Sequence, residues 1–153
     1  MQSFLFTLAH LMEATKKMNR EKLIEELKRD EGVVLVLYKC SAGKNTIGVG
    51  RNVDDRGITE EESDFLLSND IDLCIEELRA TFPWFQTLSD ARQRVMINMC
   101  FNLGLSRLMG FKKFLAAMEA GEWETAGVEM LDSKWARQVG PRSTRLRDLV
   151  LEG

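Results

Sequence analysis

Three side chains that could do chemistry stand in one short stretch: the carboxylate of Glu31, the thiol of Cys40 and the hydroxyl of Thr46. A carboxylic acid can donate a proton to a leaving group, and a thiolate can orient water or attack an electrophilic carbon. Eight residues separate Glu31 from Cys40, five separate Cys40 from Thr46, and Thr46 opens the sequence Thr-Ile-Gly-Val-Gly. Singly, each residue has an ordinary structural explanation, but their order and spacing predict that they act together.

The local sequence predicts the elements that position these residues. Asn19 can cap a helix that ends at Gly32, so Glu31 lies at the C-terminal end of that helix. The helix dipole is negative there and disfavours a second negative charge, which makes Glu31 a candidate general acid. Residues 33–39 and 46–50 are predicted to form a hairpin joined by a turn at 41–44.

The rest of the chain is predicted to be helical. After a polar connection at 51–58, Thr59 and Glu62 form a capping box for a long helix, which Pro83 ends. Ser89 can cap a central, buried helix, and shorter helices are expected at 111–120, 123–131 and 142–151. The predicted fold class is α+β, mostly α. A small lobe with a helix and a hairpin is joined by a long helix to a larger helical lobe, with a cleft between the lobes.

Composition and charge describe an ordinary folded domain. The chain has 153 residues, of which 44% are hydrophobic and 29% charged, with a net charge of −3. This charge gives no reason to expect a nucleic-acid partner. Five basic residues and no acid stand between Lys134 and Arg147, and either a solvated helix surface or a face that meets an anionic polymer would explain them.

The cysteines and the N-terminus set further expectations. Three cysteines (Cys40, Cys74 and Cys100) and one histidine, His10, lack metal-site spacing, so no metal or cofactor is expected. Cys74 and Cys100 are predicted to be core residues. No apolar run would span a membrane, and residues 1–17 are interpreted as an amphipathic extension rather than a signal peptide. Residues 18–153 are predicted to form a single domain. The extension would either pack on this domain or attach to a membrane or a partner.

Three motifs follow the hairpin along the chain: Gly57-Ile58-Thr59, Ile97-Asn98-Met99-x-Phe101-Asn102-x-Gly104 and Ser133-Lys134-Trp135. With the hairpin motif, they make the chain resemble the phage-type lysozymes, or endolysins, of glycoside hydrolase family 24, and within them the T-even phage lysozyme group. The resemblance covers about residues 19–148.

The resemblance implies hydrolysis of the β-1,4 bond between N-acetylmuramic acid and N-acetylglucosamine in peptidoglycan. Glu31 matches the general acid, Cys40 the position usually held by Asp, and Thr46 a residue that holds the attacking water. Phe101 and Asn102 match substrate-binding positions. Arg142 matches an arginine that pairs with the catalytic acid and borders the cleft.

The chain also departs from that group. The connection after the hairpin is shorter, Arg51 replaces a histidine, and Cys40 replaces a carboxylate. We expect Lys39 and Lys44 to help ionise Cys40, which would assist the attacking water together with Thr46; direct attack of sulfur on the sugar is the alternative. A catalytically weak wall-binding module, and a lysozyme regulated by a disulfide from Cys40 to Cys74 or Cys100, are alternative functions.

These inferences lead to a biological hypothesis. The chain is expected to be a monomeric endolysin of the host cytoplasm, which reaches the cell wall after a holin perforates the inner membrane. It would then cause host lysis and phage release.

Overall fold

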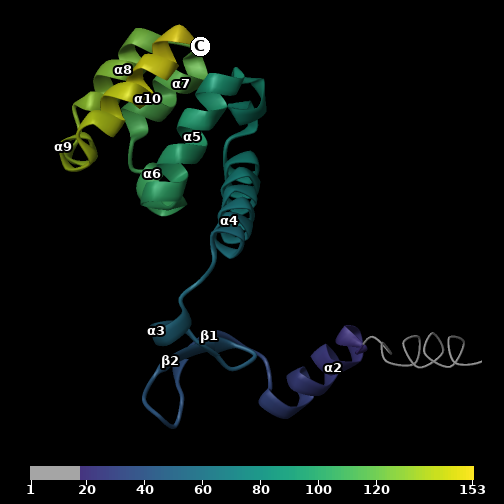
Figure 1. Ribbon diagram of the computed structural model, residues 1–153. Helices are drawn as coiled ribbons and strands as arrows, with labels where there is room; N and C mark the ends of the chain where they lie inside the picture. The colour runs from purple at the N-terminus through teal and green to yellow at the C-terminus, as the bar shows by residue number, and fades with distance from the viewer. Residues whose placement is uncertain (1–17) are drawn as a thin grey trace, which may run out of the picture. The chain divides into compact units, whose positions relative to one another are not determined.

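The computed structural model describes residues 18–153, and the chain divides into two compact units, Met1–Thr59 and Glu60–Gly153 (Figure 1). The predictions for residues 1–17, an amphipathic extension and any membrane or partner contact made through it, lie outside the described residues. That residues 18–153 act as one domain stays a prediction.

The first unit opens with helix α2, Arg20–Glu31. The side chain of Asn19 accepts a hydrogen bond of 2.9 Å from the Lys22 N–H, as the predicted cap requires. Gly32 has a φ of 76° and its N–H bonds the Lys28 carbonyl, which ends the helix. Glu31 is therefore the last helical residue, and both predicted ends of α2 are confirmed.

Three short strands follow. Strand β1, Val34–Lys39, pairs antiparallel with β2, Asn45–Gly48, so that Tyr38 faces Thr46 and Lys39 faces Asn45. Strand β3, Arg51–Asn52, pairs with the other edge of β2, which is thus the central strand of the sheet. The predicted hairpin is confirmed, and Thr46 lies on its most enclosed strand.

The prediction of a plain polar connection at 51–58 is wrong. Gly48 and Gly50 both have positive φ and reverse the chain at once, so Arg51 and Asn52 return alongside β2. Helix α3, Val53–Arg56, follows directly and is capped by the Asn52 side chain, which accepts a hydrogen bond from the Asp55 N–H. These elements are too short for residue periodicity to reveal.

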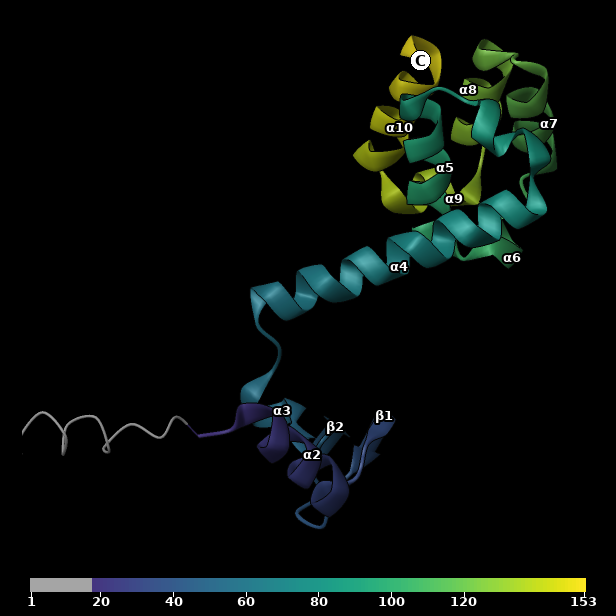
Figure 2. The same ribbon diagram turned by 90° about the vertical axis from the view of Figure 1, so that its right-hand side faces the viewer.

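The second unit is helical. Helix α4, Glu60–Thr81, is its longest element and ends before Pro83, which begins the 3-10 helix η1, Pro83–Thr87 (Figure 2). Helix α5, Asp90–Leu103, is capped by Ser89, whose hydroxyl accepts from the Arg92 N–H at 3.3 Å. The remaining helices are α6 (Leu105–Leu108), α7 (Lys112–Ala120), α8 (Trp123–Leu131), α9 (Lys134–Val139) and α10 (Pro141–Glu152).

The core of the second unit forms around α5. Val95, Met96 and Met99 are fully buried on this helix, which packs against α4, α6 and α10. Helix α8 packs against α7 and α10 and completes the bundle. The predicted α+β, mostly helical class is confirmed, as is a helix-and-hairpin unit followed by a larger helical one. Among residues 18–153, no helix has the length and apolar character needed to cross a bilayer.

Candidate active site

Cys40 and Thr46 meet at one backbone carbonyl. The Cys40 N–H donates to the Lys44 carbonyl at 3.0 Å, and the Thr46 hydroxyl donates to the same oxygen at 3.1 Å. The Gly43 N–H closes the turn by bonding the Cys40 carbonyl at 2.8 Å. The hairpin thus brings two of the three predicted catalytic residues together, with Cys40 half-buried and Thr46 only 3% exposed.

This turn favours the ionised form of the thiol. The pKa of Cys40 is lowered from its ordinary value by hydrogen bonds from the Lys44 backbone, the Ala42 backbone and the Thr46 hydroxyl, in decreasing order of effect. The charges of Lys39 and Lys44 were expected to do this. Instead the Lys44 ammonium is 2.9 Å from an Asp55 carboxylate oxygen, and the backbone donors of the turn stabilise the thiolate.

Glu31 is exposed at the end of α2 and faces the turn between β2 and β3. A Cβ atom added to Gly50 would lie 3.4 Å from Glu31 Oε2, so the carboxylate sits directly beside the Gly50 backbone. Because Gly50 has a φ of 69°, the tight turn beside the carboxylate favours a glycine at this position.

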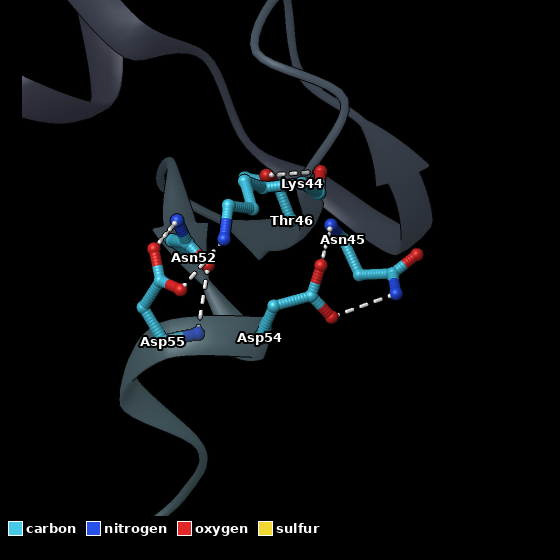
Figure 3. A network of polar contacts seen from close by, with 6 residues as sticks. All are labelled: Lys44, Asn45, Thr46, Asn52, Asp54 and Asp55. Atoms are coloured by element: carbon cyan, nitrogen blue, oxygen red, sulfur yellow. Dashed lines mark hydrogen bonds and ion pairs between the residues drawn. The ribbon is translucent and has the colours of Figure 1, made fainter.

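A polar network ties the Cys40–Thr46 turn to α3 (Figure 3). Asp54 accepts hydrogen bonds from the Asn45 N–H at 2.9 Å and from the Asn45 side-chain amide at 2.8 Å. Asp55 accepts from the Lys44 ammonium at 2.9 Å and from the Asn52 amide at 2.8 Å. The two hydrogen bonds from Asn45, first that of its N–H, lower the pKa of Asp54, so the Asp54 carboxylate is ionised at neutral pH.

The predicted substrate-binding residues belong to the second unit. Arg142 donates from Nε and Nη2 to the Asn98 side-chain oxygen at 2.9 and 2.7 Å. With Asn98 and the 45% exposed ring of Phe101, it lines a pocket of about 440 Å³ between α4, α5 and α10. That Arg142 pairs with Glu31, as the resemblance implies, stays a prediction.

Asn102 is held by a tryptophan. The Trp135 indole N–H donates to the Asn102 side-chain oxygen at 2.8 Å, which fixes the orientation of the amide. Trp135 is itself nearly buried and contacts the Phe111 ring edge to face. The amide N–H₂ of Asn102 is thereby presented as a donor.

Sequence reasoning assigned no role to several of these partners. Asn98 and Trp135 appear within the family motifs, and their spacing from Asn102 and Arg142 gave no sign of direct hydrogen bonds. Asp54 lies within the predicted polar connection at 51–58, which gives it no role of its own. Their contacts depend on side-chain directions that sequence spacing does not specify.

The other two cysteines are part of the core. Cys74 and Cys100 are buried between α4 and α5, as predicted, and all three cysteines of the chain are free thiols. Burial raises the pKa of Cys74, and raises that of Cys100 to about 12. Within residues 18–153, no three Cys, His, Asp or Glu side chains cluster in a way that could hold a metal ion.

Comparison with known proteins identifies the family. The model of the family described as "Phage lysozyme" matches residues 28–150, a span that includes α5, the whole of the first unit's sheet and all six predicted site residues. The chain belongs to the phage lysozyme family. Lysozymes are glycoside hydrolases that act on peptidoglycan, and this membership gives the class of activity expected of the chain.

Individual relatives agree with the family. The chain is 28% identical to probable T4-type lysozyme 1 of Dictyostelium discoideum, over 83% of this chain and 92% of that protein. It is 29% identical to an endolysin of Acyrthosiphon pisum secondary endosymbiont phage 1, over 85% of this chain and 88% of the relative. It is 28% identical to the pre-baseplate central spike protein of Enterobacteria phage T4 over 86% of this chain, but spans only 28% of that protein.

Proposed function

We propose that the chain is a muramidase that hydrolyses the β-1,4 bond between N-acetylmuramic acid and N-acetylglucosamine, with Glu31, Cys40 and Thr46 as its catalytic residues. The observation that carries the proposal is the shared Lys44 carbonyl, which joins Cys40 to Thr46. Family membership supplies the substrate class.

In the proposed mechanism, Glu31 is the general acid. Its exposed carboxylic acid protonates the glycosidic oxygen as the bond to the anomeric carbon breaks. Positive charge develops on the sugar ring as the bond breaks, and water then attacks the anomeric carbon. Glu31 is the last residue of α2 and its carboxylate lies beside the Gly50 backbone, next to the turn between β2 and β3.

Cys40 and Thr46 assist the water. The Cys40 thiolate accepts a proton from the water molecule while the resulting hydroxide attacks the anomeric carbon, so the net reaction adds one water across the bond. The single proton of the Thr46 hydroxyl is donated either to the Lys44 carbonyl or to the Cys40 thiolate, and in both cases its lone pairs are left to accept a hydrogen bond from the same water. With Thr46 3% exposed, its hydroxyl is held in place by the surrounding protein.

Substrate contacts are proposed in the second unit. Phe101 offers an exposed ring for an apolar sugar face, Asn102 offers amide donors, and Arg142 offers a cationic edge. We infer further that the chain lyses the host late in phage infection and depends on a holin to reach the wall, in line with its endolysin relative. Lysis of expressing cells without any holin, accompanied by processed enzyme in the periplasm, would contradict that inference.

A lysis assay tests the catalytic proposal. Purified protein is added to permeabilised Gram-negative cells, and the loss of turbidity is compared between wild type and Glu31→Gln. We expect the rate of the variant to be about 10²- to 10⁴-fold lower, since this is what a general acid contributes. Glu25→Gln, an exposed change on the same helix, is the matched control and should retain full activity. Wall binding without lysis by wild type would instead favour the non-catalytic module.

A further inference from the structure

We propose that Asp54 is a positioning residue for the Cys40–Thr46 pair, acting through the peptide group between Lys44 and Asn45. This deepens the proposed function and rests on it. Asp54 contacts neither Cys40 nor Thr46 in the described hydrogen bonds, so its effect would pass through backbone.

One peptide group carries the connection. Its carbonyl, from Lys44, accepts from both the Cys40 N–H and the Thr46 hydroxyl. Its N–H, from Asn45, donates to the Asp54 carboxylate at 2.9 Å. Because the peptide is planar, fixing its N–H also fixes the direction of its carbonyl. The carboxylate therefore sets the orientation of the atom at which the two site residues meet.

The Asp54 contact is well suited to this task. Its second oxygen binds the Asn45 side-chain amide at 2.8 Å, so the carboxylate holds Asn45 at two points (Figure 3). Hydrogen bonds to a charged acceptor are stronger and shorter than neutral ones. Asp54 is presented by α3, whose cap on Asn52 fixes it next to β3, the strand paired with β2.

Asp55 provides a matched comparison. It follows Asp54 on the same helix and carries the same charge, but it binds the Lys44 ammonium and the Asn52 amide rather than the Lys44–Asn45 peptide group. Its bonds are exposed, as those of Asp54 are, so the two residues differ in the group that each one holds rather than in burial. A change at Asp55 removes charge near the turn without releasing the peptide.

The decisive experiment measures the Cys40 thiol rather than activity. Asp54→Asn and Asp55→Asn are prepared, circular dichroism confirms that both fold, and the rate of Cys40 alkylation by iodoacetamide is followed against pH by peptide mass mapping. Loss of a negative charge near a thiol by itself lowers the thiol pKa. Loosening the turn instead weakens the backbone donors that stabilise the thiolate, which raises it.

The Cys40 pKa is therefore expected to respond differently in the two variants. In Asp54→Asn, the Cys40 pKa should rise by about one unit, and kcat should fall about tenfold with little change in KM. Asp55→Asn should leave the pKa unchanged or lower it. Asp54→Glu, which keeps the charged acceptor, should recover part of the effect.

The outcomes separate this inference from the proposed function. A Cys40 pKa that is unchanged or lowered in folded Asp54→Asn would overturn the positioning role, whatever the enzyme does. A raised pKa in a protein whose wild type shows no lysis would uphold the positioning role and remove the proposed function.

Discussion

At the scale of single residues, the unusual feature is a thiol that the turn makes easier to ionise. Cys40 is surrounded by hydrogen-bond donors from Lys44, Ala42 and Thr46, and these donors lower its pKa below the ordinary 9.0. A carboxylate at the same place would be ionised without such help. The arrangement is thus what a thiolate would need in order to take over a carboxylate's task.

The role of Cys40 predicts a particular pH dependence. The thiolate fraction grows as pH rises through the lowered Cys40 pKa, so the wild-type rate of hydrolysis should rise with pH in that range. Cys40→Asp, which is ionised throughout, should lack this rise, and Cys40→Ala should lose about 10²-fold of the rate. Initial rates on purified peptidoglycan between pH 5 and about 9 would check this. A rise of the same size in Cys40→Asp would assign it to another group.

The buried thiol of Cys100 predicts a loss of stability at high pH. The pKa of Cys100 in the folded protein, about 12, lies above the ordinary 9.0, because burial disfavours the thiolate. Unfolding exposes the thiol to water and returns its pKa to the ordinary value. The stabilisation is complete below pH 9.0 and is lost as pH rises toward 12. Thermal unfolding should show a Tm that falls across this range, and Cys100→Ala should fall less steeply. Equal slopes for the two proteins would contradict the assignment.

At the scale of elements, sequence signals located those helices that carry caps or a long apolar stripe. Asn19, Gly32, Pro83 and Ser89 each mark an observed boundary. The elements that were not predicted, β3, α3, η1, α6 and α9, have two to six residues, less than two turns of helix. Two of them, β3 and α3, carry residues of the polar network that contacts the Cys40–Thr46 turn. The hairpin could therefore be predicted from the sequence, but the elements that hydrogen-bond to it could not.

The Ser89 cap should contribute to stability and leave catalysis unchanged. Its hydroxyl satisfies the Arg92 N–H at the start of α5, the helix at the centre of the second unit's core. Ser89→Ala should lower the free energy of unfolding by about 1 kcal/mol, as typical N-caps do. Urea denaturation measures this, with Ser106→Ala, an exposed serine on α6, as the control. A change in Ser89→Ala no larger than in the control would show that the cap contributes nothing.

At the scale of the whole molecule, the residues with proposed roles are divided between the two units. Glu31, Cys40 and Thr46 stand in the first, and Phe101, Asn102 and Arg142 in the second. Their order along the chain was enough to predict the family and the proposed roles. The contacts behind them, such as Asn98 on Arg142 and Asp54 on Asn45, follow from side-chain geometry and could not be deduced from spacing.

The free thiols predict that activity does not depend on the redox state. Cys40 lies in the first unit, while Cys74 and Cys100 are buried in the second, and none is in a disulfide. The rate of lysis should therefore be the same with and without a reductant such as dithiothreitol. An increase of several fold on reduction, abolished in Cys74→Ala or Cys100→Ala, would establish the disulfide-regulated alternative.

The most direct test of the account is the anomeric configuration of the first product, followed by proton NMR as the enzyme cleaves soluble peptidoglycan fragments. If Glu31 donates a proton and Cys40 with Thr46 activates water, the β bond is cut by a single displacement, and the new reducing end appears first as the α anomer. A β anomer formed first would mean that sulfur attacks the sugar, and the water-activating role of Cys40 and Thr46 would be wrong.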